Sequence, residues 1–429
     1  MKLKTLSTAM ILATLPMTGA FAAAMDRSGQ SIAAFLQPGN YFEAGISVLD
    51  ADVSGTNNQL NGLGPIPGAA PQSTGDMASS YYFPSAALKL QLTDNFSFGL
   101  LYDQPFGAKA EYEARGAWSA FSAGGEGTEA EVHTENVTML LGFQPNENWN
   151  FYAGPVYQEV KGEVSLRGAA YSALSGYDAD MKKDSELGWA AGLAFQIPEI
   201  ALKASLTYRS EIEHELDTTE TGLPVGLPVT IPNVGTQILP LPAIVNGKTN
   251  VTTPQSVNLD LQSGIMADTV AFLNVRWVNW DGFEIRPNAF GNTLNGLAGY
   301  ADQATAIGQP ALANTLASLD GGNLVEYNKD QWTVTTGVGR KFSEKWAGNV
   351  SVGWDSGAGN PVTTLGPTEG YWNVGLGLQY SPTPATFIAG GVKYFWLGDA
   401  TALTVANPEV GEFEDNNAIG YGLKIGYRF

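Results

Sequence analysis

The sequence predicts an all-β protein, a transmembrane antiparallel β-barrel of about fourteen strands with a short N-terminal plug in its lumen. Three observations predict this fold: a start with the pattern of an export signal, many short segments in which apolar and polar residues alternate, and tight polar corners between them. Charged residues make up only 15% of the chain, whereas aromatic residues reach 11% and glycine supplies 51 of 429 residues. Weak strand signals that recur along an exported chain are typical of outer-membrane barrels.

The first 22 residues have the pattern of a signal peptide. The basic residues Lys2 and Lys4 precede an apolar stretch from Thr5 to Thr18, and small residues follow up to Ala22. The apolar stretch is shorter than the roughly 20 residues that a spanning helix needs, which disfavours the alternative of an uncleaved anchor. We therefore expect cleavage near residues 22–24 and export to the outer membrane of a Gram-negative cell.

Residues 23–40 precede the first strand and are too long for a simple chain end. They are mostly small or polar, and we assign Asp26, Arg27 and Phe35 to a plug that fills the lumen. Residues 41–429 are then expected to form the barrel and its long extracellular loops. An open diffusion porin, which would have no plug, is the alternative.

Six short polar corners divide the chain into hairpins. Each hairpin has two strands, and the strand that begins at Tyr41 and the terminal strand bring the total to about fourteen, an even number as in single-chain bacterial barrels. Aromatic residues directly after several corners suit the belt at a membrane interface. The corners are Asp94–Phe96, Glu147–Trp149, Pro198–Glu199, Ala267–Asp268, Glu344–Trp346 and Ser381–Pro384.

The expected strands have two distinct faces. From Leu202 to Tyr208, every second residue is apolar, and we expect this face to contact lipid. The alternate residues from Lys203 onward, continuing through Glu211 to Glu215, are polar and are expected to face a wet lumen, because a dry core would leave their charges unpaired. The last strand is divided in the same way, and its aromatic residues Tyr427 and Phe429 resemble the signal that the outer-membrane barrel assembly machinery binds.

Long connections alternate with the corners and are expected on the extracellular side. One of them, Leu223–Val245, is apolar and interrupted by prolines, and exposed apolar surface of this size usually marks a contact site. Ile238, Leu239 and Leu241 are our candidates for ligand contact there, and a loop packed on its own small core is the alternative. The expected connections are residues 110–129, 167–185, 217–252, 286–321 and 400–414.

Charge and composition disfavour several other functions. The net charge of −20 argues against a nucleic-acid partner, and the absence of cysteine excludes disulfides and thiol chemistry. The two histidines, His133 and His214, are expected on the surface, with His214 on the lipid side of its strand. A catalytic base, a transition-metal site and a cofactor are therefore not expected, and neither is an enzyme.

Four stretches together resemble the FadL-type family of outer-membrane transporters for long-chain fatty acids and other hydrophobic compounds. They are residues 36–55, Leu101–Gly107, Leu206–Ile212, and Trp346 with residues 353–361. The resemblance implies a monomeric barrel that captures a hydrophobic ligand at its outer loops and passes it to a pocket in the lumen. The ligand is then released sideways into outer-membrane lipid through a gap in the third strand.

This resemblance also implies roles for individual residues. Pro105 and Gly107 would interrupt the pairing of the third strand, and Phe106 between them would gate the gap or touch the ligand. Basic residues for a fatty-acid carboxylate are expected near Lys161, Arg167 and Lys329. The plug is short for the family, and Gln37–Gly39 replaces its usual Asn-Pro-Ala. Aromatic hydrocarbons or alkanes are therefore alternative ligands.

Overall fold

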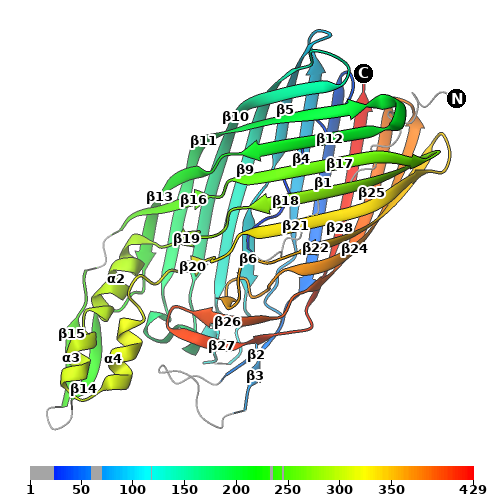
Figure 1. Ribbon diagram of the computed structural model, residues 1–429. Helices are drawn as coiled ribbons and strands as arrows, with labels where there is room; N and C mark the ends of the chain where they lie inside the picture. The colour runs from blue at the N-terminus through cyan, green and yellow to red at the C-terminus, as the bar shows by residue number, and fades with distance from the viewer. Residues whose placement is uncertain (1–23, 59–69, 117, 232–234, 244–245) are drawn as a thin grey trace.

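The computed structural model describes residues 24–58, 70–116, 118–231, 235–243 and 246–429; the expected signal peptide lies outside these residues. The chain forms a closed antiparallel barrel of fourteen strands, as predicted (Figure 1). The main sheet contains 17 hydrogen-bonded strands, because three wall positions are each built from two consecutive strands. Strand β1 pairs with both β4 and β28, which closes the barrel.

The wall strands follow one another in chain order. They are β1 (Tyr41–Asp52), β4 (Tyr81–Gln91), β5 (Phe96–Asp103) with β6 (Gly107–Glu111), β9 (Glu129–Phe143), β10 (Trp149–Ser165), β11 (Asp178–Ile197), β12 (Leu202–Arg209) with β13 (Ile212–Thr221), β16 (Gly247–Thr253) with β17 (Ser256–Met266), β18 (Thr269–Val278), β21 (Gln331–Lys341), β22 (Trp346–Asp355), β24 (Tyr371–Thr383), β25 (Thr386–Leu397) and β28 (Asn417–Arg428).

All six predicted corners join neighbouring wall strands at one end of the barrel, which we call the turn end. The 3-10 helix η3 (Pro198–Ile200) forms one of them. Tyr41 pairs with Arg428, so the described N-terminal region and the C-terminus also meet at the turn end. The loop end differs from expectation, since β11 begins at Asp178 and β13 continues to Thr221, where loops were predicted. Residues 53–58, 70–80 and 356–370 also lie in connections there, which were not predicted.

Aromatic side chains mark two levels on the outer face of the barrel. Trp277 pairs with Trp332, and Trp372 pairs with both Trp354 and Trp396, so five tryptophans lie on neighbouring strands from β18 to β25. We call this set the tryptophan row. A second set of exposed aromatics lies near the turn end, and it includes Phe96, Phe143, Trp149 and Trp346. Two aromatic levels around an apolar band are typical of the two interfaces of a membrane-spanning barrel.

The two faces of β12 agree with prediction, but those of β13 do not. Thr207 and Arg209 turn inward and are buried. Ser210 and Glu211 then lie outside the regular strand, and the alternation reverses, so that His214 is buried with 2% of its surface exposed. The predictions of a surface His214 and of lumenal glutamates were therefore wrong. The reversal keeps Glu213 and its neighbouring carboxylates in solvent, where their charges are hydrated.

Packed loops cover the loop end of the barrel. A five-stranded sheet lies there, with β2 (Thr56–Asn57), β3 (Gln72–Ser73), β23 (Val362–Thr363), β26 (Ala400–Thr404) and β27 (Asn407–Phe413). Three short pairs accompany it: β7 (Ser122–Ala123) with β8 (Glu126–Gly127), β14 (Gly226–Ile231) with β15 (Gly235–Pro240), and β19 (Glu284–Ile285) with β20 (Val325–Glu326). The helices are η2 (Ala169–Leu174), α2 (Asn288–Ala298), α3 (Ala301–Ala306) and α4 (Pro310–Ala317). Among the described residues, none of the helices has the length and apolar character needed to cross a membrane.

The helices in the loop after β18 were not predicted, and one wall residue holds them in place. The buried carboxylate of Glu220 on β13 accepts hydrogen bonds from the backbone N–H groups of Ala289 (2.8 Å) and Phe290 (2.7 Å) in the first turn of α2. It also accepts one from the Tyr177 hydroxyl at 2.9 Å. These donors lie where a helix leaves N–H groups unsatisfied, so Glu220 both caps the helix and attaches it to the wall.

Candidate functional site

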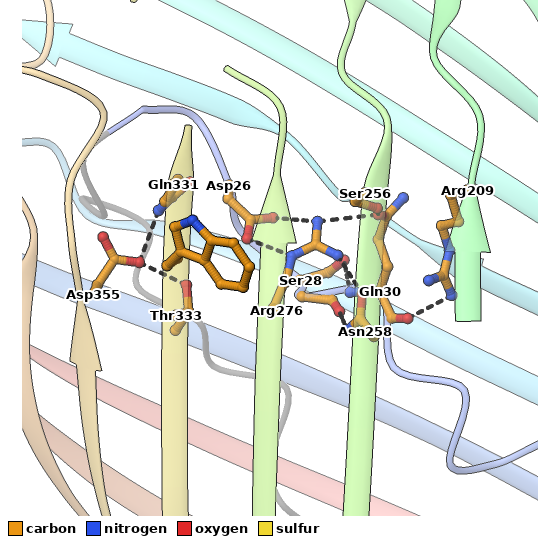
Figure 2. A network of polar contacts seen from close by, with 12 residues as sticks. Asp26, Ser28, Gln30, Arg209, Ser256, Asn258, Arg276, Gln331, Thr333 and Asp355 are labelled. Atoms are coloured by element: carbon orange, nitrogen blue, oxygen red, sulfur yellow. Dashed lines mark hydrogen bonds and ion pairs between the residues drawn. The ribbon is translucent and has the colours of Figure 1, made fainter. Parts of the chain in front are cut away.

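Residues 24–40, the N-terminal segment, run through the lumen and contact several wall strands. Figure 2 shows its strongest contact, in which the Asp26 carboxylate receives two hydrogen bonds from the Arg276 guanidinium of β18, at 2.8 and 3.0 Å. Both side chains are almost completely buried, at 1% and 0% exposed. A buried ion pair of this kind holds only when its remaining polar atoms are also satisfied.

Neighbouring polar groups satisfy the rest of this ion pair. Arg276 also donates to the amide oxygen of Asn258 at 2.7 Å and to that of Gln30 at 3.1 Å. Gln30 in turn receives bonds from Ser256 and, through its backbone carbonyl, from Arg209 (Figure 2). Four wall residues on β12, β17 and β18 therefore hold a short stretch of the N-terminal segment.

Two further contacts hold the segment nearer the turn end. The ammonium groups of Lys203 and Lys89 donate to the backbone carbonyls of Leu36 (2.7 Å) and Gly39 (2.8 Å). Phe35 is inserted into a notch in the wall, where a methyl group added at Gly99 or Gly142 would collide with its ring. The ring of Tyr152 closes this notch at a centroid distance of 5.5 Å, edge to face. We call it the glycine notch.

The third wall strand is interrupted where the N-terminal segment reaches it. Strand β5 ends at Asp103 and β6 begins at Gly107, and their registers with β9 differ by one residue. Within the interruption, the Phe106 N–H donates to the Thr134 hydroxyl at 2.9 Å, and that hydroxyl donates back to the Phe106 carbonyl at 2.7 Å. The break is therefore a bulge whose backbone is satisfied by a side chain.

The N-terminal segment takes the place of a neighbouring strand at this interruption. The N–H of Gly107 donates to the Met25 carbonyl at 2.8 Å, and the N–H of Arg27 donates to the Pro105 carbonyl at 2.7 Å. On the wall itself, the ladder between β4 and β5 ends at the pair Ala86 and Tyr102. The next residues of β4, 82–85, pair with β1, and the ladder between β4 and β5 does not extend to them.

Arg27 lies beside this part of the wall. Its guanidinium is 4.0 Å from the centre of the Tyr81 ring, a cation–π distance. A side chain at position 107 would collide with the same guanidinium, so glycine is needed there for close approach. Phe106 is buried beside this place and packs edge to face on Trp280, with ring centroids 5.4 Å apart. The strand break, the segment and Trp280 thus form one connected site.

Trp280 connects the break to a second polar group. Its indole N–H donates to the side-chain carbonyl of Gln331 at 2.8 Å. Gln331 and Thr333 both donate to the Asp355 carboxylate, at 2.8 and 2.7 Å, as Figure 2 shows. The aromatic side chain beside the break therefore has a fixed orientation.

An apolar pocket, partly open to solvent, lies against the break on its loop side. Met25 of the N-terminal segment and Ala108 of β6 contribute to it, so the pocket and the break share residues. No lysine or arginine of the described chain lines it, and the two glutamates that border it lie on the outward phase of β9 and β10. The lining residues are Met25, Ala108, Ala130, Glu131, Val132, Glu163, Val164, Met181, Ile285, Leu324, Val325, Tyr327, Thr363 and Leu365.

The basic residues expected in the ligand site lie elsewhere. Lys161 is exposed on the outer face of β10, and Lys329 is exposed in the loop before β21. Arg167 forms ion pairs at 2.8 Å with Glu126 and Asp178 in the covering loops. Arg276 was not predicted as a site residue. A lone cation on the lumenal face of an otherwise apolar strand nevertheless indicates a buried partner.

The apolar connection 223–245 contains the hairpin of β14 and β15, and residues 232–234 and 244–245 lie outside the described chain. Ile238 is 73% exposed, whereas Leu239 is half-buried. Leu241 is also half-buried and lies close to Gly296 of α2. The hairpin and helix project beyond the barrel wall (Figure 1). The connection therefore has both an exposed apolar side chain, Ile238 on β15, and a packed base.

Among the described residues, no three His, Asp or Glu side chains are placed to hold a metal ion. The His214 ring is hydrogen-bonded to Asp184 and Gln158, both at 3.0 Å, and lies in the wall rather than in the pocket. In the covering loops, burial raises the pKa of Tyr171 to about 12, so its hydroxyl stays neutral and bonds to Thr364 at 3.0 Å.

Comparisons with known proteins agree with this architecture. The profile of a family described as outer membrane protein transport protein (OMPP1/FadL/TodX) matches residues 22–429. A FadL homologue from Pseudomonas aeruginosa has 16% sequence identity and a TM-score of 0.67, over 92% of each chain. The toluene transporter TodX of Pseudomonas putida has 12% identity and a TM-score of 0.58, over 97% of this chain and 100% of that one. The toluene transporter TbuX of Ralstonia pickettii has 11% identity and a TM-score of 0.56, over 97% and 99%. No curated protein matches the chain in sequence.

Proposed function

The chain belongs to the outer membrane protein transport family (OMPP1/FadL/TodX), and on this premise we propose that it takes up uncharged hydrophobic molecules rather than fatty acids. The family assignment makes the protein an outer-membrane β-barrel transporter for hydrophobic compounds, with its loop end facing outward. The choice of an uncharged ligand depends on one observation, the pocket beside the strand break, which is apolar and has no cation in its lining.

The energetics of burial support an uncharged ligand. A carboxylate moved from water into an apolar pocket without a partner loses several kcal/mol of hydration free energy. Lys161 and Lys329 are exposed outside the pocket, and Arg167 already has two carboxylate partners. A fatty acid would therefore enter only in its protonated form, whereas an aromatic hydrocarbon or alkane has no charge to bury. TodX and TbuX, which share the fold, are described as toluene transporters.

The position of the pocket supports lateral release of the ligand into the membrane. Transfer of each CH₂ group from an apolar site into water costs about 0.8 kcal/mol, so a path into periplasmic water is unfavourable. Met25 and Ala108 belong to the pocket and flank Gly107, beyond the end of the ladder between β4 and β5. In this scheme Phe106 and Arg27 close the gap, and their movement opens the pocket to lipid.

The N-terminal segment acts as the plug in this scheme, and residues 1–22 act as the cleaved signal. The N-terminal segment contacts four wall strands through Asp26, Gln30, Leu36 and Gly39. These contacts support a lumen closed to water-soluble solutes, which disfavours a diffusion porin. Ile238 supplies exposed apolar surface for capture at the outer loops. Tyr427 and Phe429 serve recognition by the barrel assembly machinery, and the barrel acts as a monomer in outer-membrane lipid.

The proposal is tested by comparing two labelled substrates in cells that lack their own transporters of this family. We expect the protein to accelerate uptake of radiolabelled toluene but not of oleate at neutral pH. A matched pair of variants checks the role of pocket charge: Val132→Lys should lower toluene uptake, and the outward-facing Glu131→Lys should not. Faster oleate uptake with no effect on toluene would contradict the proposal.

A further inference from the structure

The wall contains a second break, between β11 and the position formed by β12 and β13. The ladder continues from the turn end to the pair Ala190 and Arg209, and it resumes only at Met181 and Thr218. We call the intervening boundary the seam; it consists of residues 182–189 facing residues 210–217. Unpaired strand edges are costly in a membrane barrel, so a break of this length calls for a functional explanation.

Strand β11 is accessible from both faces along the seam. Glu186 shares the inward phase of Asp184 and the buried Ala190, yet it is exposed. The outward-facing Ser185 and Leu187 are exposed as well, and Leu187 has 69% of its surface in solvent. Between the seam and the turn end, the inward-facing Ala190 and Ala194 of the same strand are buried, so the seam opens β11 toward the lumen.

Side chains take the place of the missing ladder. His214 of β13 points inward, and its ring nitrogens lie 3.0 Å from the Asp184 carboxylate and 3.0 Å from the Gln158 amide of β10. At the end nearer the turns, the Trp189 N–H donates to the Ser210 hydroxyl at 3.0 Å, and one backbone bond remains there, from the Ser210 N–H to the Trp189 carbonyl. Side-chain contacts can separate and re-form without unravelling a strand, which a continuous ladder cannot do.

The seam leads from the outer surface to the pocket. Met181 ends the seam and also lines the pocket. Leu216, on the other side of the seam, belongs to the same buried apolar cluster as Met181 and Met25. Tyr208 adjoins the seam at the end nearer the turns. It pairs with Val257, which in turn pairs with Trp277, so Tyr208 lies level with the tryptophan row. The seam therefore begins just outside the apolar band.

We propose that the seam is a side inlet, through which uncharged hydrophobic molecules pass from the surface of the outer leaflet into the pocket. His214 and Asp184 form its latch. The inference rests on the proposed function and adds an entrance to it. The entrance lies in the wall, whereas packed loops cover the end of the barrel. The exposed carboxylates of Glu186, Glu213 and Glu215 border the inlet and repel anionic amphiphiles, in agreement with an uncharged substrate.

Closing the latch with a covalent bridge tests the inlet, because the native chain has no cysteine. The variant Asp184→Cys/His214→Cys is bridged in cells with dibromobimane, which becomes fluorescent when it joins two thiols. Bridging should reduce the uptake of radiolabelled toluene to the level of cells without the protein. The reference for this loss is the uptake of the same double variant before treatment. Treatment should leave the uptake of each single variant at that variant's own untreated level. Undiminished uptake by the bridged protein would overturn the inlet.

Labelling of single cysteines tests seam opening without any transport assay. Leu216 lies at the seam, whereas Val160 lies in the same cluster on β10, which is paired on both sides. Their exposed fractions are 1% and 3%. With a membrane-impermeant maleimide on intact cells, Leu216→Cys should react severalfold faster than Val160→Cys, and toluene should slow the reaction. Equal rates would refute seam opening even if the bridged variant failed to assemble. Fast labelling in a protein that does not transport toluene would instead refute the proposed function.

Discussion

Replacing Arg276 by methionine should release the N-terminal segment from the lumen. The substitution keeps most of the side-chain volume but leaves the Asp26 carboxylate, 1% exposed, without its charged partner. Removal of one member of a buried ion pair costs about 3–5 kcal/mol. At about 1.4 kcal/mol per tenfold change, the ratio of docked to released segment falls by about a hundredfold to a few thousandfold.

Conductance across a planar bilayer measures this release. We expect the native barrel to stay closed to ions and Arg276→Met to open a conducting path through the lumen. The double variant Asp26→Asn/Arg276→Met is the matched control, because it removes both charges and should conduct less than the single variant. Folding of each barrel is checked by its heat-modifiable mobility on a gel. A folded Arg276→Met barrel that stays as closed as the native one would refute the idea that the ion pair holds the segment.

Three further predictions concern other contacts of the site. Phe35→Ala empties the glycine notch and should weaken docking of the segment by about 3–5 kcal/mol, the usual cost of deleting a buried phenylalanine. The rate of protease cleavage within the segment measures this, and a rate equal to that of the native protein would contradict it. Pro105→Thr with Gly107→Val should abolish toluene uptake but preserve binding at the outer surface, since both substitutions favour a straight, fully paired third strand; persistent uptake would argue against lateral release. Glu220→Ala leaves two buried N–H donors of α2 unsatisfied, which should cost about 1–3 kcal/mol of stability per group. We expect faster hydrogen exchange at Ala289 and Phe290, and native exchange rates there would show that other contacts hold the helix.

The sequence predicts the barrel well because the information that specifies it is local. Each corner, such as Asp94–Phe96, combines turn chemistry with an interface aromatic, and all six join neighbouring strands in the structure. The alternation of β12 follows from the same local rule. It fails in β13, because Ser210 and Glu211 leave the ladder and reverse the faces that strict alternation assigns.

The interior of the barrel is much less predictable, because its contacts join distant parts of the chain. Asp26 and Arg276 are separated by 250 positions, and nothing near either residue identifies the other. The glycine notch likewise becomes a site for Phe35 only when β5 and β9 lie side by side. Lys161 and Arg167 were chosen by resemblance, and neither lines the pocket, because pocket lining depends on strand tilt and on the way loops fold over the barrel.

The contacts of residues 24–40 constrain the order of assembly. Their partners extend from Lys89 on β4 to Arg276 on β18, so most of the wall must exist before they can all form. The same residues lead directly into β1, which completes the cylinder by pairing with β28, the last strand to be synthesised. The segment enters the lumen from the turn end, next to the residues that close the wall. Docking of the segment and the final pairing of β1 with β28 are therefore coupled steps of assembly.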